Sequence, residues 1–434
     1  MFERPRSGER ALLVHITLNY LSEQASLEEF ITLAYSAGVT PVAQITGRRQ
    51  LPDPGLFIGT GKLEEMTTVI TTQHVEVVLF NHTLTPAQER NLERLLQCRV
   101  VDRNSLILDI FSQRARSFEG KLQVELAQLQ HLSTRLIRGW THLERQKGGI
   151  GLRGPGETQL ETDRRLIAAR IKSIHNRLEK VRQQRQLSRK ERQRAQLPVI
   201  SLVGYTNAGK STLFNRLTTA HAYTANQLFA TLDTTLRRVH LTEHCTVIMA
   251  DTVGFIQQLP PDLIKAFQAT LEEIRQAQLL IHVVDAHDPE RQLRMHQVNQ
   301  ILTELQAHTL PQIIVYNKID KTDKQNAYTE RDHQGHIKQI GLSALNGKGI
   351  ELLKAAILEH LNPNMVQRWV QIPAQAGRLR ARLFALGTIL QEHYNDNGDS
   401  ILEIQIPAED LMQLTMMDLK ILPINPLARL SQPS

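Results

Sequence analysis

Short apolar runs alternate with amphipathic segments along the first part of the chain. Ala11–Ile16 and Val75–Phe80 have the composition of strands. Ser26–Glu29 has the form of a capping box that opens a helix, and Thr85–Leu96 carries the apolar stripe of an amphipathic helix. This alternation predicts a small α/β domain with a largely parallel sheet in residues 1–112.

The pattern then changes to two apolar stripes with coiled-coil spacing, which predict two long helices in residues 113–196. The first stripe consists of Leu122, Leu126, Leu129, Leu136 and Trp140, and the second of Ile167, Ile171, Ile174, Leu178 and Val181. The glycine-rich segment Gly148–Gly156 between them cannot continue a helix. We therefore expect an antiparallel helical hairpin with a glycine-rich tip, whose arms each reach about 40–50 Å at 1.5 Å per residue.

From Pro198 onward the pattern is strand, glycine loop and helix, repeated. It predicts a doubly wound α/β domain in residues 197–361. In residues 362–434, Leu402–Pro407 is strand-like, whereas the pattern of Arg378–Glu392 fits either a helix or a strand. We expect a small α+β domain there.

Composition excludes several classes of protein. The 434 residues are too many for one hydrophobic core, and 41% apolar with 22% charged residues is ordinary for a globular chain. No apolar run approaches the roughly 20 residues that cross a bilayer, and the N-terminus leads into a strand-like run instead of a signal-peptide core. Cys98 and Cys245 stand in no C-x-x-C motif, so we predict neither disulfides nor a zinc site. We expect a cytoplasmic protein without a membrane span.

Positive charge is concentrated in one segment of the predicted hairpin. Residues 164–194 contain twelve basic and two acidic residues, a local net charge of +10, whereas the whole chain carries +7. Such a stripe favours a polyanion as partner, with RNA as the leading candidate. Arg153, within the glycine-rich segment, is a candidate RNA contact. The alternative is that Arg153 and the basic face are simply solvated.

A phosphate-binding motif follows the hairpin. Gly204–Ser211 matches G-x-x-x-x-G-K-[ST] between the apolar strand Pro198–Val203 and a predicted helix, the context that the motif requires. The backbone N–H groups of this loop are expected to face the β-phosphate, Lys210 to reach the β- and γ-phosphates, and Ser211 to ligate Mg²⁺. Gly59–Lys62 resembles the motif but fails it, because neither Ser nor Thr follows the lysine.

Three later segments narrow the expected ligand to GTP or GDP. The carboxylate of Asp251, at a strand end, can hold a Mg²⁺-bound water, and the Gly254 N–H can reach the γ-phosphate. Asp320 can accept hydrogen bonds from guanine N1–H and N2–H₂, which adenine lacks. Ser343–Leu345 can offer a backbone N–H to guanine O6. Because each segment follows a strand, we expect all of them at the carboxyl edge of one sheet, in a P-loop GTPase domain.

The expected nucleotide contacts extend over these loops. Lys318 is expected to lie over the purine and Asn317 to tie its loop to the phosphate-binding loop; Lys210, Thr231 and Gly254 are the expected catalytic groups. The full set is Gly204, Tyr205, Thr206, Asn207, Ala208, Gly209, Lys210, Ser211, Thr212, Phe229, Ala230, Thr231, Leu232, Asp233, Asp251, Thr252, Val253, Gly254, Asn317, Lys318, Ile319, Asp320, Ser343, Ala344 and Leu345.

The second Mg²⁺ ligand, beside Ser211, is expected between the first helix of this domain and the strand that begins at Thr246. Phe229–Thr235 offers three threonines, of which we favour Thr231 and keep Thr234 and Thr235 as alternatives.

The residue after Gly254 is Phe255, where Ras-like GTPases carry a glutamine that orients the attacking water. A phenyl ring cannot do this, so we expect slow intrinsic hydrolysis that a partner accelerates. Gln257 and Gln258 are candidates to compensate.

Taken together, these residues resemble the HflX family of bacterial GTPases over essentially the whole chain. The most distinctive similarity is Gly148–Arg165, which looks like that family's signature between the N-terminal and GTPase domains. Leu228–Asp233 is similar to the family's switch I, which implies that Thr231 binds Mg²⁺. Members commonly have Pro where this chain has Thr234.

The resemblance implies a cytoplasmic monomer that binds the 50S ribosomal subunit, with its 23S rRNA, and dissociates stalled or stress-arrested 70S ribosomes. In some members of the family the N-terminal region binds ATP, although no motif here locates such a site. Two alternatives are a GTPase of ribosome assembly or RNA modification, and a scaffold that uses its nucleotide only for stability. Intact Lys210, Ser211 and Asp251 argue against the scaffold.

Overall fold

The computed structural model describes residues 8–18, 27–139, 155–194, 197–218, 228–229, 231–242, 245–257, 273–323, 325–333, 335–361, 365–386, 388–395, 397–415 and 419–422. Several predicted features lie outside these residues: Ser26 of the capping box, Trp140, Arg153 with most of the glycine-rich tip, Ala230 and Gln258. Among the described helices, none is both long and apolar enough to cross a membrane.

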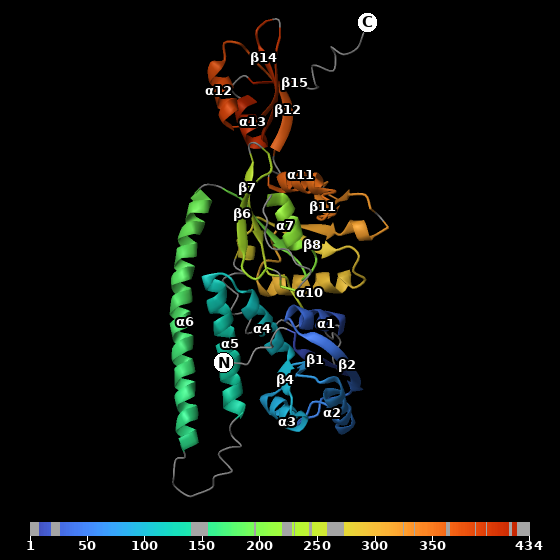
Figure 1. Cartoon of the computed structure of the whole chain (residues 1–434). Helices are drawn as coiled ribbons and strands as arrows, with labels where there is room; N and C mark the ends of the chain where they lie inside the picture. Colours follow the sequence, from blue (N-terminus) through green and yellow to red (C-terminus); the bar gives the residue numbers. More distant parts are fainter. Residues whose placement is uncertain are drawn as a thin grey trace. The chain divides into compact units, whose positions relative to one another are not determined.

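The N-terminal sheet has four strands in the order β2-β1-β3-β4, joined by three parallel pairings. This confirms the predicted α/β domain. Figure 1 shows this part of the chain in blue. Its elements are β1 (Arg10–Leu18), α1 (Leu27–Ser36), β2 (Thr40–Arg49), α2 (Thr60–Gln73), β3 (Val77–Phe80), α3 (Pro86–Leu96), β4 (Arg99–Asp102) and α4 (Arg103–Arg114). Thr85 caps α3 in a capping box with Gln88, so that helix begins one residue later than the sequence pattern indicates.

Helices cover both faces of this sheet. Alternate residues of β1 point to opposite faces, so Leu13 packs with Phe30 of α1, whereas Leu12 packs with Met66 of α2. Strands buried on both faces explain why β1 and β3 read as continuous apolar runs instead of alternating ones.

The predicted hairpin consists of α5 (Phe118–Gly139) and α6 (Pro155–Arg194). The helices are antiparallel, because Arg170 of α6 pairs with Glu125 while Arg185, further along α6, pairs with the earlier Glu119. The predicted stripes meet in one apolar seam, which comprises Leu122, Leu126, Leu129, Ile171, Ile174 and Leu178.

The predicted length of the second arm was too short. At 1.5 Å per residue, the 40 described residues of α6 reach about 60 Å instead of 40–50 Å, whereas the 22 described residues of α5 reach about 33 Å and the chain beyond Gly139 lies outside the described residues. The sequence pattern also placed Pro155 and Gly156 in the non-helical tip, but both belong to α6. Proline is tolerated in the first turn of a helix, where its missing N–H has no partner to lose.

A seven-stranded sheet of order β10-β11-β9-β8-β5-β7-β6 forms the nucleotide-binding fold. The five adjacent strands β11, β9, β8, β5 and β7 are parallel. The elements are β5 (Val199–Val203), α7 (Lys210–Thr218), β6 (Thr235–His240), β7 (Thr246–Asp251), β8 (Leu279–Asp285), α10 (Arg291–Glu304), β9 (Gln312–Asn317), the 3₁₀ turn Ile319–Lys321, β10 (Tyr328–Arg331), β11 (Ile337–Gly341) and α11 (Ile350–Leu361).

The C-terminal part confirms the predicted α+β domain and resolves its ambiguous segment into a helix followed by a strand. Its elements are β12 (Met365–Ile372), α12 (Gly377–Leu386), β13 (Thr388–Tyr394), β14 (Ser400–Pro407), α13 (Ala408–Thr415) and β15 (Lys420–Leu422). The antiparallel sheet of order β13-β14-β12-β15 makes this a split βαβ arrangement. Leu383 of α12 and Leu414 of α13 pack with the strand residue Ile404 in its core.

By its internal contacts the chain divides into two compact units. The first comprises residues 1–239, 247–329 and 338–350, and therefore includes the N-terminal sheet, the hairpin and the nucleotide-binding loops. The second comprises residues 240–246, 330–337 and 351–434. Everything described below as one site lies in the first unit.

Candidate functional site

The phosphate-binding motif lies between β5 and α7, as its sequence predicts. Gly209 has a φ of +92°, and a Cβ there would lie 2.2 Å from Asn317 Nδ2. Only glycine fits both this backbone conformation and this close approach. Asn207 also has a left-handed backbone, with φ 59°, so the loop curls tightly ahead of Lys210.

Lys210 is buried beneath this loop. Its Nζ donates to the carbonyl oxygens of Gly204 at 3.0 Å and of Tyr205 at 2.7 Å. Its pKa is lowered to about 8: burial is the main cause, the carboxylate of Asp251 opposes the shift, and the nearby charge of Lys318 adds to it. Burial thus disfavours the charged form of Lys210, and a phosphate bound beside it would stabilise that charged form.

Three oxygen-bearing side chains converge beside Lys210. Ser211 Oγ lies 2.7 Å from Thr231 Oγ1 and donates to Asp251 Oδ2 at 2.8 Å; Thr231 Oγ1 donates to the same oxygen at 2.9 Å. Burial raises the pKa of Asp251, and its other oxygen, Oδ1, is buried without a hydrogen-bond partner among the described residues. Hydroxyl and carboxylate oxygens fit Mg²⁺, and an orphaned carboxylate oxygen is a group that a hydrated cation would satisfy.

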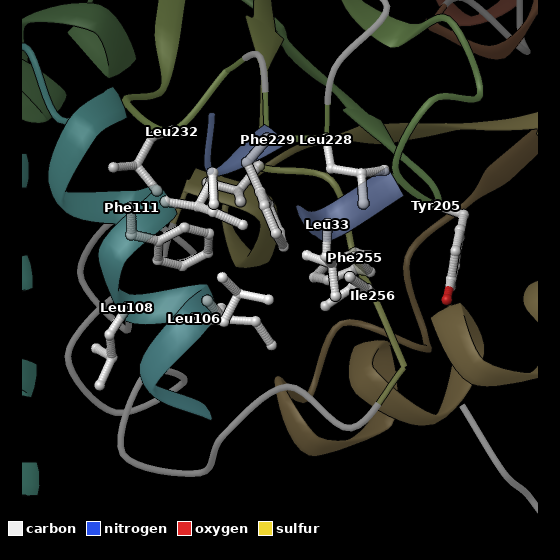
Figure 2. Packing of buried hydrophobic residues seen from close by; sticks show 14 of the residues in the cluster. Leu33, Leu106, Leu108, Phe111, Tyr205, Leu228, Phe229, Leu232, Phe255 and Ile256 are labelled. Carbon is white, nitrogen blue, oxygen red and sulfur yellow. The ribbon is translucent and has the colours of Figure 1, made fainter. Parts of the chain in front are cut away.

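The segment after β7 lies against the phosphate-binding loop. A Cβ on Gly254 would lie 3.0 Å from Lys210 Nζ, which places this backbone directly beside the lysine. Phe255 and Tyr205 form a bridge, in which Thr206 N donates to Phe255 O at 2.8 Å. The Phe255 side chain is buried in the apolar cluster shared with α1 and α4, together with Leu33 and Leu106 (Figure 2).

The predicted base-binding loops also converge. Asn317 Nδ2 donates to Ala208 O at 2.9 Å, and Asn317 Oδ1 accepts from Ala344 N at 2.9 Å. Asn317 thus ties its loop to the phosphate-binding loop, as expected, and also binds the segment Ser343–Leu345. Ser343 Oγ donates to Asp320 Oδ1 at 2.5 Å, which holds the carboxylate that the sequence assigns to guanine.

Several predicted contact residues have side chains directed elsewhere. Phe229 and Leu232 are buried against α4, where Phe229 meets Phe111 edge to face at 4.5 Å (Figure 2). The Thr252 hydroxyl donates to Leu202 O at 2.6 Å, and Leu345 is 65% exposed. Nucleotide contact by these residues stays a prediction, and their backbone atoms would have to make it.

Sequence reasoning missed a buried polar cluster beneath the site. Arg103 donates to Asn81 Oδ1 and Glu29 Oε1, both at 2.6 Å, and to the Gln257 carbonyl at 3.1 Å. Tyr205, the second residue of the phosphate-binding loop, donates its hydroxyl to Glu29, and that hydroxyl accepts from Gln257 N at 2.9 Å. Gln257 is therefore held by its main chain to the N-terminal domain.

Asp285 was also missed. It ends β8 and accepts from Lys318 Nζ at 2.7 Å, while Lys318 donates to Asn207 O at 2.6 Å. The sequence did contain a signal for this residue, because Asp285 is an acidic side chain at the carboxyl end of an apolar strand.

A parallel sheet with a phosphate loop, an Asp-x-x-Gly segment and an Asn-Lys-x-Asp loop at one edge defines a P-loop GTPase. Family profiles described as "GTP-binding GTPase N-terminal", "GTP-binding GTPase Middle Region" and "50S ribosome-binding GTPase" match residues 24–112, 114–192 and 199–318. The chain is 52% identical to GTPase HflX of Escherichia coli strain K12 over 414 residues, which cover 95% of this chain and 97% of that protein. It belongs to the HflX family of GTPases.

Other relatives agree with this assignment. GTPase HflX of Magnetococcus marinus is 41% identical over 412 residues, covering 94% of this chain and 95% of that protein. Among solved structures, that described as the complex of SsGBP with GDP is similar at 23% identity and a TM-score of 0.47, covering 81% of this chain and 98% of that one.

Proposed function

We propose that this chain, in its GTP-bound form, binds the 50S ribosomal subunit through α6 and dissociates stalled or stress-arrested 70S ribosomes. GTP hydrolysis then releases it from the subunit. The family profile of a 50S ribosome-binding GTPase supports the partner, and the charge distribution on α6 supports the surface.

In the proposed nucleotide site, Lys210 and the loop N–H groups bind the phosphates, and Asp320 selects guanine. Ser211 and Thr231 would ligate Mg²⁺ directly, and Asp251 would hold a Mg²⁺-bound water. The ion would neutralise charge on the β- and γ-phosphates. Thr231 is preferred over Thr234 and Thr235 because its hydroxyl contacts both Ser211 and Asp251. The Gly254 N–H, beside Lys210, is available to the γ-phosphate.

We propose slow intrinsic hydrolysis because Phe255 faces the N-terminal core, which removes it from any role in orienting water. The main chain of Gln257 is bound by Arg103 and Tyr205, so this segment would have to rearrange before its glutamine could take that role. Binding to the ribosome is the event that would supply the rearrangement or the missing group.

The single observation that carries the RNA-directed part is the division of basic residues on α6. One set flanks the seam with α5: Arg170 pairs with Glu125, and the Arg177 guanidinium lies 5.0 Å from the Phe118 ring centroid. A second set is exposed and, at about 100° per residue, falls within a sector of about 80° on the opposite side of the helix. This set, the outer stripe, consists of Arg165, Lys172 and Lys180.

A surface of lysine and arginine directed away from the packing seam suits phosphate groups of an RNA without strong sequence preference. Arg170 and Arg177 have partners on α5, so the charge of α6 is not uniformly available. Among the residues of α6 whose side chains the structure describes, the outer stripe is directed away from α5 and is available for such a contact.

Sedimentation of purified ribosomes tests the proposal. With a non-hydrolysable GTP analogue, the protein should convert 70S ribosomes to subunits and migrate with mature 50S particles, whereas with GDP it should remain near the top of the gradient. Association only with immature particles would instead support the alternative, a GTPase of ribosome assembly or RNA modification.

A further inference from the structure

The loop that carries Thr231 is anchored on both sides of that residue to the N-terminal domain and the hairpin. On one side, Leu228 N donates to Ser36 Oγ of α1 at 3.0 Å, and Phe229 packs on Phe111. On the other side, Leu232 is buried and the Asp233 carboxylate reaches the start of α5. Thr231 lies between these anchors with its hydroxyl at Ser211 and Asp251 (Figure 2 shows the flanking residues).

The Asp233 carboxylate is bound by the first residues of the hairpin in three ways. Its Oδ2 accepts from Arg116 N at 2.9 Å and Ser117 N at 2.7 Å, and its Oδ1 accepts from the Ser117 hydroxyl at 2.5 Å. That hydroxyl in turn accepts from Gly120 N at 2.8 Å, the bond by which an N-cap residue closes the first turn of a helix. Asp233 therefore completes the cap of α5, where the helix dipole also favours a negative charge.

Gly120 fits this arrangement from the helix side. A Cβ at position 120 would lie 2.1 Å from Asp233 Oδ1 and 3.0 Å from Ser117 Oγ. The carboxylate thus occupies the space that any other residue would need, and a substitution there must displace it.

We propose that Asp233 is a positioning residue for GTP hydrolysis, which holds Thr231 at the Mg²⁺ site by capping α5. The proposal rests on the role of Thr231 proposed above. Its consequence is that the loop that carries Thr231 and the first turn of α5 move together. A nucleotide-dependent shift of Thr231 therefore displaces the base of the hairpin, and a displacement of the hairpin shifts Thr231 by the same coupling.

The first experiment measures GTP hydrolysis as a function of Mg²⁺ concentration. Asp233→Ala should raise the Mg²⁺ concentration for half-maximal rate about tenfold, the size expected for a lost cap. Affinity for GDP in EDTA should stay within about twofold, because this residue contacts the loop and not the phosphates. Ser117→Ala and Gly120→Ala disturb the same contact from α5, and should shift the Mg²⁺ dependence in the same direction even if the Asp233 variant folds poorly.

Asp53→Ala is the matched control. Asp53 Oδ1 also accepts two backbone N–H bonds, from Gly55 and Leu56, but in a turn of the N-terminal domain. Loss of a carboxylate cap that is merely structural should leave the Mg²⁺ dependence at the wild-type value. An unchanged Mg²⁺ dependence in the variants at Asp233, Ser117 and Gly120 would overturn the proposal.

A second measurement follows the coupling itself. Hydrogen exchange of the amides of Arg116 and Ser117 should differ between the full-length protein bound to GDP and to a GTP analogue with Mg²⁺, and Asp233→Ala should abolish that difference. Equal exchange in both wild-type states would contradict the coupling. Thr231→Ala separates the two levels of inference: if it leaves the Mg²⁺ dependence unchanged, the assignment of the Mg²⁺ ligand fails, whereas an effect of Thr231→Ala without one at Asp233 refutes only the positioning role.

Discussion

At the scale of single residues, the site is built around charges that the fold alone does not balance. Lys210 is buried with two carbonyl oxygens as its hydrogen-bond acceptors, and one oxygen of Asp251 has no partner within the described part of the chain. Both groups are costly to bury in this state. Phosphate and a cation are the ligands that would satisfy both, so binding energy at this site comes partly from relieving that cost.

This arrangement predicts a pH dependence for nucleotide binding. In the free protein the pKa of Lys210 is lowered to about 8, and bound phosphate should raise it again. Between pH 8 and the higher pKa of the complex, binding must take up a proton, so GDP affinity should be constant below pH 8 and fall by up to about tenfold per pH unit above it.

Calorimetry in two buffers of different ionisation enthalpy measures this uptake directly. At pH 8.5 the protein should take up more than half a proton for each GDP bound, and at pH 7 almost none from this lysine. Binding without proton uptake at pH 8.5 would show that Lys210 is fully charged in the free protein.

The sequence predicted the residues of this site better than their partners. Local motifs located Lys210, Asp251 and Asn317, because each follows a recognisable strand and glycine pattern. Glu29 and Arg103 carry no such local signal: their contacts join segments that lie far apart in the chain, and only the fold brings them together. For the same reason the sequence read Asp233 as part of the nucleotide loop, whereas its carboxylate caps α5.

At the scale of elements, periodicity predicted which residues meet but not where helices end. The apolar stripes of α5 and α6 form one seam, as expected. Helix ends depend on caps and on partners outside the periodic pattern, such as Ser117 with Asp233 at the start of α5. The start of α6 was misjudged because Pro155, which the pattern placed in the tip, belongs to the first turn of that helix.

The cluster of Arg103 connects three elements and should be the most sensitive point between them. Its guanidinium is 1% exposed and binds Glu29, Asn81 and the Gln257 carbonyl, while Tyr205 shares Glu29. Arg103→Ala leaves a buried carboxylate without its cation, which costs about 3–5 kcal/mol in comparable cases.

Hydrogen exchange of the Gln257 amide, which donates to the Tyr205 hydroxyl, reports opening at this junction. Arg103→Ala should lower its opening free energy by about that amount. Arg331→Ala is the control, because the ion pair of Arg331 with Glu359 has exposed fractions of 52% and 30% and such pairs contribute at most about 1 kcal/mol. Similar protection of Gln257 in the Arg103 variant and the wild type would mean that the apolar contacts alone hold the junction.

At the scale of the molecule, the first compact unit joins the nucleotide site to the hairpin through continuous packing. The cluster that contains Leu33 and Leu106 of the N-terminal domain extends to Phe229 and Leu232 of the loop that carries Thr231, and to Phe255 of the segment after β7 (Figure 2). Interiors of this kind transmit displacement because they are close-packed. A nucleotide-dependent change in these two loops can therefore displace α5 and, across the seam, α6.

The outer stripe of α6 should then determine how strongly the GTP-bound protein holds the 50S subunit. Replacing Arg165, Lys172 and Lys180 together by glutamine removes three charges without touching the seam with α5. We expect the slope of log affinity against log salt concentration to decrease by about one for each charge that contacts phosphate, hence by up to about three. The exchange of Arg170 and Glu125 for glutamines is the matched control, since it removes a seam-side pair and leaves the outer stripe intact.

Pelleting of 50S subunits at several salt concentrations, with a GTP analogue present, measures both slopes. If the outer stripe binds rRNA, the triple variant should lose affinity most at low salt and approach the wild type at high salt, while the control keeps the wild-type slope. Equal slopes for the variant and the wild type would assign ribosome binding to other surfaces and leave α6 as a solvated structural arm. The comparison separates a loss of positive charge on the outer stripe from the loss of a seam-side ion pair, which leaves the net charge of the protein unchanged.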